Sequence, residues 1–190
     1  GREVCRSSLL DNLDVSGDPT SLLYRSDLIR KNQPFFPHSL PHADTSSFYK
    51  YLQSHNFGFV HEILSTERVH DQQVSATMNR VGAGNAATLE IFLTYGPIYL
   101  SEVEFAGGKR HLLQEYYRWL GGSVLKMRDK EFWKYHTSRL RDLGYPLQWR
   151  KVIKATMDEI LDEIQNPFLA FRKLFMVMRL RYQNRYGGRS

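Results

Sequence analysis

The sequence has almost no cysteine, since Cys5 is the only one among 190 residues. A single cysteine excludes an intramolecular disulfide and excludes zinc sites built from several cysteines of one chain. A chain of this length with 42% hydrophobic residues is long enough to bury a core without such cross-links. The cysteine content therefore favours an intracellular, reducing compartment, whether cytoplasm, nucleus or organelle matrix.

Long hydrophobic runs are also lacking. The densest run, 174–178, is bounded by Lys173 and Arg179 and is far shorter than the roughly 20 apolar residues that cross a bilayer. We therefore expect no transmembrane segment. The chain begins Gly1-Arg2-Glu3, without a methionine or the apolar stretch of a signal peptide, which is compatible with a processed form, a polyprotein product or a trimmed form.

The usual signatures of catalysis and cofactor binding are missing. There is no Gly-x-Ser-x-Gly elbow, and Gly82-Ala83-Gly84 lacks the lysine and helix context of a phosphate-binding loop. His38 and His42 have the four-residue spacing of helical metal ligands, but Pro41 lies between them. The sequence therefore predicts no cofactor, no metal and no catalytic residue, and it favours a protein that is not an enzyme.

Charge is distributed unevenly along the chain. Residues 1–108 carry 8 Lys/Arg against 12 Asp/Glu, whereas residues 109–190 carry 18 against 8, within a total net charge of +6. A strongly basic half is typical of proteins that meet a polyanion, such as RNA, DNA, an anionic membrane surface or an acidic protein face. The second half of the chain is therefore where we expect a partner to bind.

The middle of the chain alternates apolar and polar residues with a period of two, which favours strands. The strands are expected near 57–67, 72–81, 87–95 and 98–105. The glycine-rich run 82–85 and the Tyr95-Gly96-Pro97 sequence are typical of tight turns, and short connections favour antiparallel pairing. The sequence therefore predicts an α+β fold with an antiparallel β-meander of about four strands over 57–105.

Helices are expected on both sides of this sheet. Residues 1–45 predict a mostly extended segment with one short helix near 21–30, and residues 46–108 open with a helix near 46–54. After Gly107-Gly108 the period changes to that of a helix, and four helices are expected near 109–120, 129–143, 147–165 and 167–185. We expect the basic helical region 109–190 to form one compact domain with 46–108.

Aromatic residues alternate with cations in this basic region. Nucleic-acid surfaces use both, because cations neutralise phosphates while rings stack on unpaired bases. We therefore predict a non-enzymatic nucleic-acid-binding or ribonucleoprotein-assembly protein, with RNA favoured over DNA. The candidate binding residues are Lys109, Arg110, Arg118, Trp119, Lys134, Arg150, Lys151, Lys154, Arg172, Lys173, Arg179, Arg181 and Arg185.

Two alternatives remain open at the level of sequence. Phe168, Phe171, Phe175 and Met178 belong to an apolar stripe that is equally compatible with core and with an interface, so the chain is also compatible with an assembly subunit of a viral or organellar complex, including a homo-oligomer. A third hypothesis is a metal-dependent nuclease. It uses Glu90, Glu102 and Glu104, carboxylates that adjacent strands would bring together around Mg²⁺.

Overall fold

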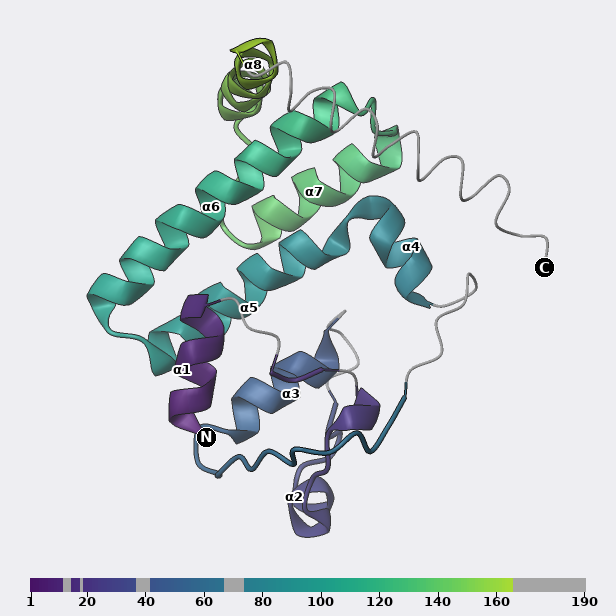
Figure 1. Ribbon diagram of the computed structural model, residues 1–190, viewed down its shortest axis with the longest axis vertical. Coiled ribbons are helices and arrows are strands. Elements are labelled where there is room, and N and C mark those ends of the chain that lie inside the picture. The colour runs from purple at the N-terminus through teal and green to yellow at the C-terminus, as the bar shows by residue number, and fades with distance from the viewer. Residues whose placement is uncertain (12–14, 18, 37–41, 67–73, 166–190) are drawn as a thin grey trace, which may run out of the picture. The chain divides into compact units, whose positions relative to one another are not determined.

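A computed structural model describes residues 1–11, 15–17, 19–36, 42–66 and 74–165 (Figure 1). Within these ranges every regular element is a helix. The elements are α1 (Arg2–Asp11), the 3₁₀ helix η1 (Pro19–Ser21), α2 (Ser26–Lys31), α3 (Ala43–Tyr51), α4 (Val74–Val81), α5 (Ala83–Tyr99), α6 (Glu102–Leu125), α7 (Lys130–Asp142) and α8 (Trp149–Gln165).

The chain divides into two compact units. Unit 1 comprises Gly1–Tyr116 and Lys130–Leu147, and unit 2 comprises Tyr117–Asp129 and Gln148–Ser190. The long helix α6 contributes its first part to unit 1 and its last part to unit 2.

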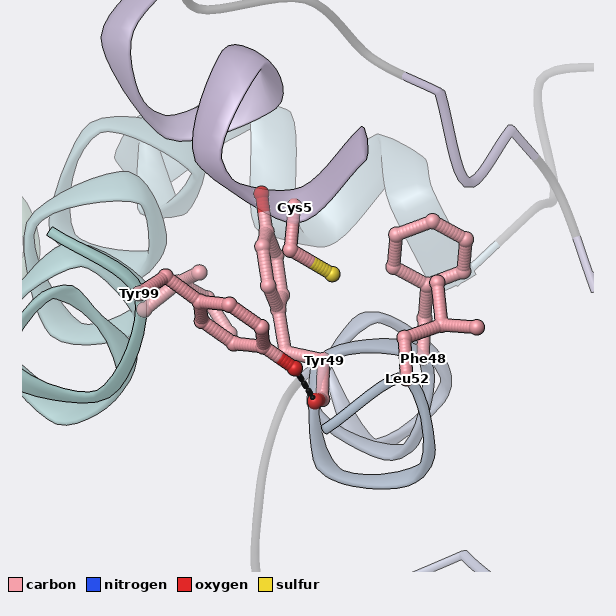
Figure 2. Close-up of a cluster of buried hydrophobic side chains, with 6 residues drawn as sticks. Cys5, Phe48, Tyr49, Leu52 and Tyr99 are labelled. Atoms are coloured by element: carbon pink, nitrogen blue, oxygen red, sulfur yellow. Dashed lines mark hydrogen bonds between the residues drawn. The ribbon is translucent and has the colours of Figure 1, made fainter. Parts of the chain in front are cut away.

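Unit 1 is organised around α5, which contacts α1, α3, α4 and α7. The buried core between α1, α3 and α5 includes Cys5, Phe48, Tyr49, Leu52 and Tyr99, whose side chains are drawn in Figure 2. The hydroxyl of Tyr99 donates a hydrogen bond to the backbone oxygen of Tyr49, as the dashed line shows. The polar tip of Tyr99 is thus satisfied while its ring fills the core.

A buried histidine connects α4, α6 and α7 within unit 1. His136 is fully buried, and its Nε2 lies 2.7 Å from the backbone oxygen of Val81. Because a carbonyl only accepts, Nε2 carries the proton, and Nδ1 accepts a hydrogen bond from the Tyr116 hydroxyl at 2.5 Å. Phe132 packs against the imidazole ring with centroids 4.4 Å apart. Both ring nitrogens are therefore paired in the core.

The predicted antiparallel sheet is wrong. Residues 57–66 have no regular secondary structure, 74–81 form α4, 87–95 lie inside α5, and 98–105 run from the end of α5 into α6. No strand occurs anywhere in the described ranges. The α+β class and the meander over 57–105 are replaced by an all-helical architecture over the described residues.

The enclosed position of α5 explains this error. A helix that is contacted by several others carries apolar residues on more than one face, so its 3.6-residue period is weak. Its sequence from Ile91 to Tyr95 is also rich in β-branched and aromatic residues, which favour strands by composition. Tertiary packing therefore overrides both local signals.

Two of the glycines that indicated turns or element boundaries allow close packing instead. A Cβ on Gly96 would lie 2.6 Å from Cδ2 of Phe105, and a Cβ on Gly108 would overlap the ring of Phe92. The rings of Phe92 and Phe105 stack with centroids 5.6 Å apart in the space these glycines leave. Gly82 does behave as a turn residue, with φ of 66° at the N-terminus of α5.

The helical predictions fare better. The helices expected near 129–143 and 147–165 are confirmed as α7 and α8, and the one near 109–120 is part of the longer α6. Within 1–45 the described residues include α1 as well as the short α2. The helix expected at 167–185 lies outside the described residues, and the grouping of 46–108 with 109–190 stays a prediction.

Candidate functional site

The predicted cationic site is spread over both units. Lys109 and Arg110 on α6 and Lys134 on α7 belong to unit 1, while Arg118 and Trp119 on α6 belong to unit 2. The remaining described cations of the site, at 150, 151 and 154, share the first two turns of α8. Arg172, Lys173, Arg179, Arg181 and Arg185 lie outside the described residues. The structure therefore brings three predicted cations together, on α8.

Most of the aromatics interleaved with these cations serve as core. Tyr116, Tyr117 and Phe132 are buried, and Trp119 is half-buried. Trp149 differs, because 53% of it is exposed at the start of α8. The packing of these residues therefore does not indicate a surface on which bases stack on several rings.

In unit 2, α8 packs closely against α6. Val152 is buried, and the Thr156 hydroxyl lies 3.3 Å from the backbone oxygen of Gly121. A Cβ on Gly121 would lie 2.7 Å from the backbone carbon of Ala155, so glycine is what permits this approach. The Tyr117 hydroxyl accepts the backbone N–H of Gln148 at 3.1 Å and thereby helps to position the start of α8.

The side of α8 next to this contact is apolar and exposed. With 3.6 residues per turn, positions four, four, three and four apart share one side of a helix, and this spacing connects 149, 153, 157, 160 and 164. The exposed apolar side chains, which we call the α8 face, are Trp149 (53% exposed), Ile153 (57%), Met157 (58%), Ile160 (40%), Leu161 (50%) and Ile164 (69%).

The apolar arc of α8 is thus wider than the arc that α6 covers. Val152, Ala155 and Thr156 meet α6, while the α8 face extends the apolar surface around the helix. Contiguous exposed apolar side chains mark sites of protein or membrane contact more often than isolated ones do. The spacing was readable in the sequence, but only the structure shows that one part of the arc is buried and the other exposed.

Two of the three carboxylates proposed for a nuclease, Glu90 and Glu104, have other partners. Glu90 on α5 pairs with Arg139 of α7, and both side chains are mostly buried. Glu104 in the first turn of α6 accepts the backbone N–H of Ser101 at 3.0 Å and pairs with Arg6, and these contacts lower the pKa of its carboxyl. Among the described residues, no group of three or more His, Cys, Asp or Glu is placed to hold a metal ion.

Unit 1 also contains a hollow of about 710 Å³ lined by residues of α1, α3, α5 and α6. Asp11, His42, His111 and Glu115 line it together with apolar side chains. The Nε2 atom of His42 is buried there without a hydrogen-bond partner. The hollow has the size of a small-molecule site, but this mixture of carboxylates and imidazoles does not define one ligand class.

The sequence matches no protein-family model, and comparisons with curated proteins and with solved structures gave no match. A transmembrane span is likewise absent from the described helices, none of which combines the required length and apolar character. Function therefore has to be argued from the surfaces of the two units.

Proposed function

We propose that this protein acts in assembly, binding another protein surface through the α8 face. The observation that carries the proposal is the row of six apolar side chains, each between 40% and 69% exposed, along one side of a well-formed helix. Burying such side chains against a partner is favourable by about 25 cal/mol for each Å² of apolar surface removed from water.

The position of the α8 face supports this proposal. Gly121 and Val152 anchor α8 against α6, so the face is held by a packed scaffold and needs little reorganisation before binding. An amphipathic helix that presents anchors at i, i+4 and i+8 is a recurrent recognition element, which docks in a groove or beside another helix. Charged residues of α8 flank the α8 face, and the rim of a protein interface is usually polar in the same way.

A site-specific photo-cross-linker tests this proposal, because it captures whichever protein contacts the face. Benzoylphenylalanine in place of Trp149 preserves an aromatic side chain at an exposed position of the face. The matched control is the same replacement at Val103, which is 83% exposed on the unit 1 part of α6. We expect covalent protein adducts from position 149 and none from position 103, detected by gel shift and identified by mass spectrometry.

A companion variant connects the adducts to the face itself. Ile153→Gln and Met157→Gln together remove two central apolar side chains at exposed positions, where the fold tolerates polar residues. Adducts at position 149 should then fall at least tenfold, with an unchanged far-ultraviolet circular dichroism spectrum. Equal cross-linking from positions 149 and 103, or adducts that persist in the double variant, would contradict assembly through the α8 face.

Nucleic-acid binding is a second candidate, which one observation favours. Arg150, Lys151 and Lys154 are all exposed within the first two turns of α8, the helix that begins with the exposed Trp149. Single-stranded RNA is the ligand that such a combination suits best. The acidic residues in the second half of α8 limit the length of this basic surface.

Salt dependence tests this second candidate. Binding to a fluorescent single-stranded RNA should weaken as salt rises, and removing the three α8 cations should reduce the slope of log K against log salt by about 2, because each phosphate contact contributes about 0.7. Fluorescence anisotropy measures both. Undetectable binding at low ionic strength would rule out RNA binding by α8. So would a salt slope that is unchanged when Arg150, Lys151 and Lys154 are all replaced by glutamine.

A further inference from the structure

We infer that the protein bound by the α8 face is a second copy of the same chain, with the two α8 helices side by side and antiparallel. This inference rests on the proposed function and names its partner. Three observations carry it: the symmetric spacing of the apolar side chains, the segregation of charge along α8 and the mismatch of that charge with the helix dipole.

The apolar side chains of α8 match themselves when the helix is reversed. If Trp149 of one copy lies level with Ile164 of the other, Ile153 lies level with Ile160, and Met157 falls next to the two-fold axis. Each pair then brings two exposed apolar side chains together. A two-fold interface has to be self-complementary in this way, because the same surface patch is used twice.

Charge is segregated along the same helix. The first six residues of α8 include Arg150, Lys151 and Lys154, whereas Asp158, Glu159 and Asp162 follow in the next two turns. A parallel pair places like charges level with each other, which is unfavourable. An antiparallel pair places the basic half of each helix beside the acidic half of the other.

The register set by the apolar pairs also aligns these charges. Along the helix axis it brings Lys154 within one residue of Asp158 of the second copy. Lys154 and Asp158 share one flank of the helix, where they form an exposed i,i+4 pair at 3.2 Å. Lys154 of each copy is therefore within one residue of the level of Asp158 of the other copy, across the two-fold axis.

The order of the charges is unfavourable for an isolated helix. Carboxylates stabilise the N-terminal turn of a helix and cations the C-terminal turn, because of the helix dipole. In α8 the first turn has no acidic residue, the last turn has no basic residue, and the cations stand at the N-terminal end. The antiparallel partner supplies carboxylates at that end and cations at the other, so pairing compensates the mismatch.

Engineered cysteines distinguish this arrangement from its alternatives. In the antiparallel register, Met157 lies beside Met157 of the second copy. The two copies of Trp149 are offset along the helix axis by fifteen residues, or about 23 Å at a rise of about 1.5 Å per residue. We therefore expect Met157→Cys to form a disulfide-linked dimer under mild oxidation of the full chain. Trp149→Cys alone should stay monomeric on a non-reducing gel, and Trp149→Cys combined with Ile164→Cys should cross-link.

Two controls accompany these variants. The parent chain retains only Cys5, which is fully buried and should give no dimer, and Val103→Cys reports cross-linking by random collision at an exposed site. Dimer from Met157→Cys in at least tenfold excess over Val103→Cys supports the inference. Efficient dimer from Trp149→Cys alone, or yields from every variant no higher than the Val103→Cys yield, would overturn it.

The proposed function and this inference fail in different ways. If photo-cross-linking at position 149 captures a different protein and Met157→Cys does not dimerise, assembly through the α8 face stands and self-pairing is wrong. If position 149 captures no protein at all, the proposed function fails first.

Discussion

The two glycines at 121 and 122 predict opposite responses to the same substitution. Alanine is favoured over glycine inside a helix by about 0.5–1 kcal/mol. A Cβ on Gly122 meets no atom within 4 Å, so Gly122→Ala should gain roughly this amount. A Cβ on Gly121 would lie 2.7 Å from backbone of Ala155 and 2.8 Å from that of Thr156, atoms that move only if α8 moves.

The difference between the two variants follows from that clash. Overpacking a well-packed contact costs about 1–3 kcal/mol. Because the gain in helix propensity is common to both variants, the free energy of unfolding of Gly121→Ala should be lower than that of Gly122→Ala by about 1–3 kcal/mol. Urea unfolding, followed by the far-ultraviolet circular dichroism signal of the helices, measures both free energies of unfolding. Equal stabilisation by the two substitutions would refute the close packing of α8 on α6.

Two further predictions concern unit 1. Tyr116→Phe removes the donor to Nδ1 of the buried His136 and should destabilise the fold by about 1–3 kcal/mol in urea unfolding; an unchanged midpoint would contradict that hydrogen bond. Burial, with a smaller contribution from Asp44, raises the pKa of Tyr24 to about 12. The unfolded tyrosine releases its proton near pH 10 and the folded one near pH 12, so stability falls as pH rises between these values. Tyr24→Phe also removes a buried hydroxyl that has no hydrogen-bond partner. This substitution should abolish about 1 kcal/mol of that loss, after allowance for the partial exposure of the residue, and an identical alkaline profile would contradict this assignment.

The sequence predicted the helices that have one exposed side and failed for the one that is enclosed. In α7 and α8 the apolar residues occupy only part of the helix circumference, so the 3.6-residue period is visible and the ends were placed within about two residues of the observed ones. In α5, apolar residues face α1, α3, α4 and α7, and the glycine and proline near its end imitate a turn. Pro97 lies in the last turn of α5, where its missing N–H disturbs few helical hydrogen bonds.

The candidate site was predictable in composition but not in geometry. The sequence correctly places Arg150, Lys151 and Lys154 on one helix, yet it cannot show that Trp149 is exposed while Tyr117 is buried. Both rings stand beside cations in the sequence, so the local pattern does not separate stacking platforms from core. That distinction depends on which part of α8 the glycine at 121 brings against α6.

The central claim is that the α8 face drives self-assembly, and the mass of the full chain in solution tests it most directly. Sedimentation equilibrium from about 1 μM to about 1 mM covers the range of weak dissociation constants expected for a pair of single helices. We expect the mass to rise from 22.3 kDa towards twice that value, and Ile153→Gln with Met157→Gln to remain at the monomer mass. A wild-type chain that stays monomeric over this range, or a double variant that associates equally well, would contradict the account.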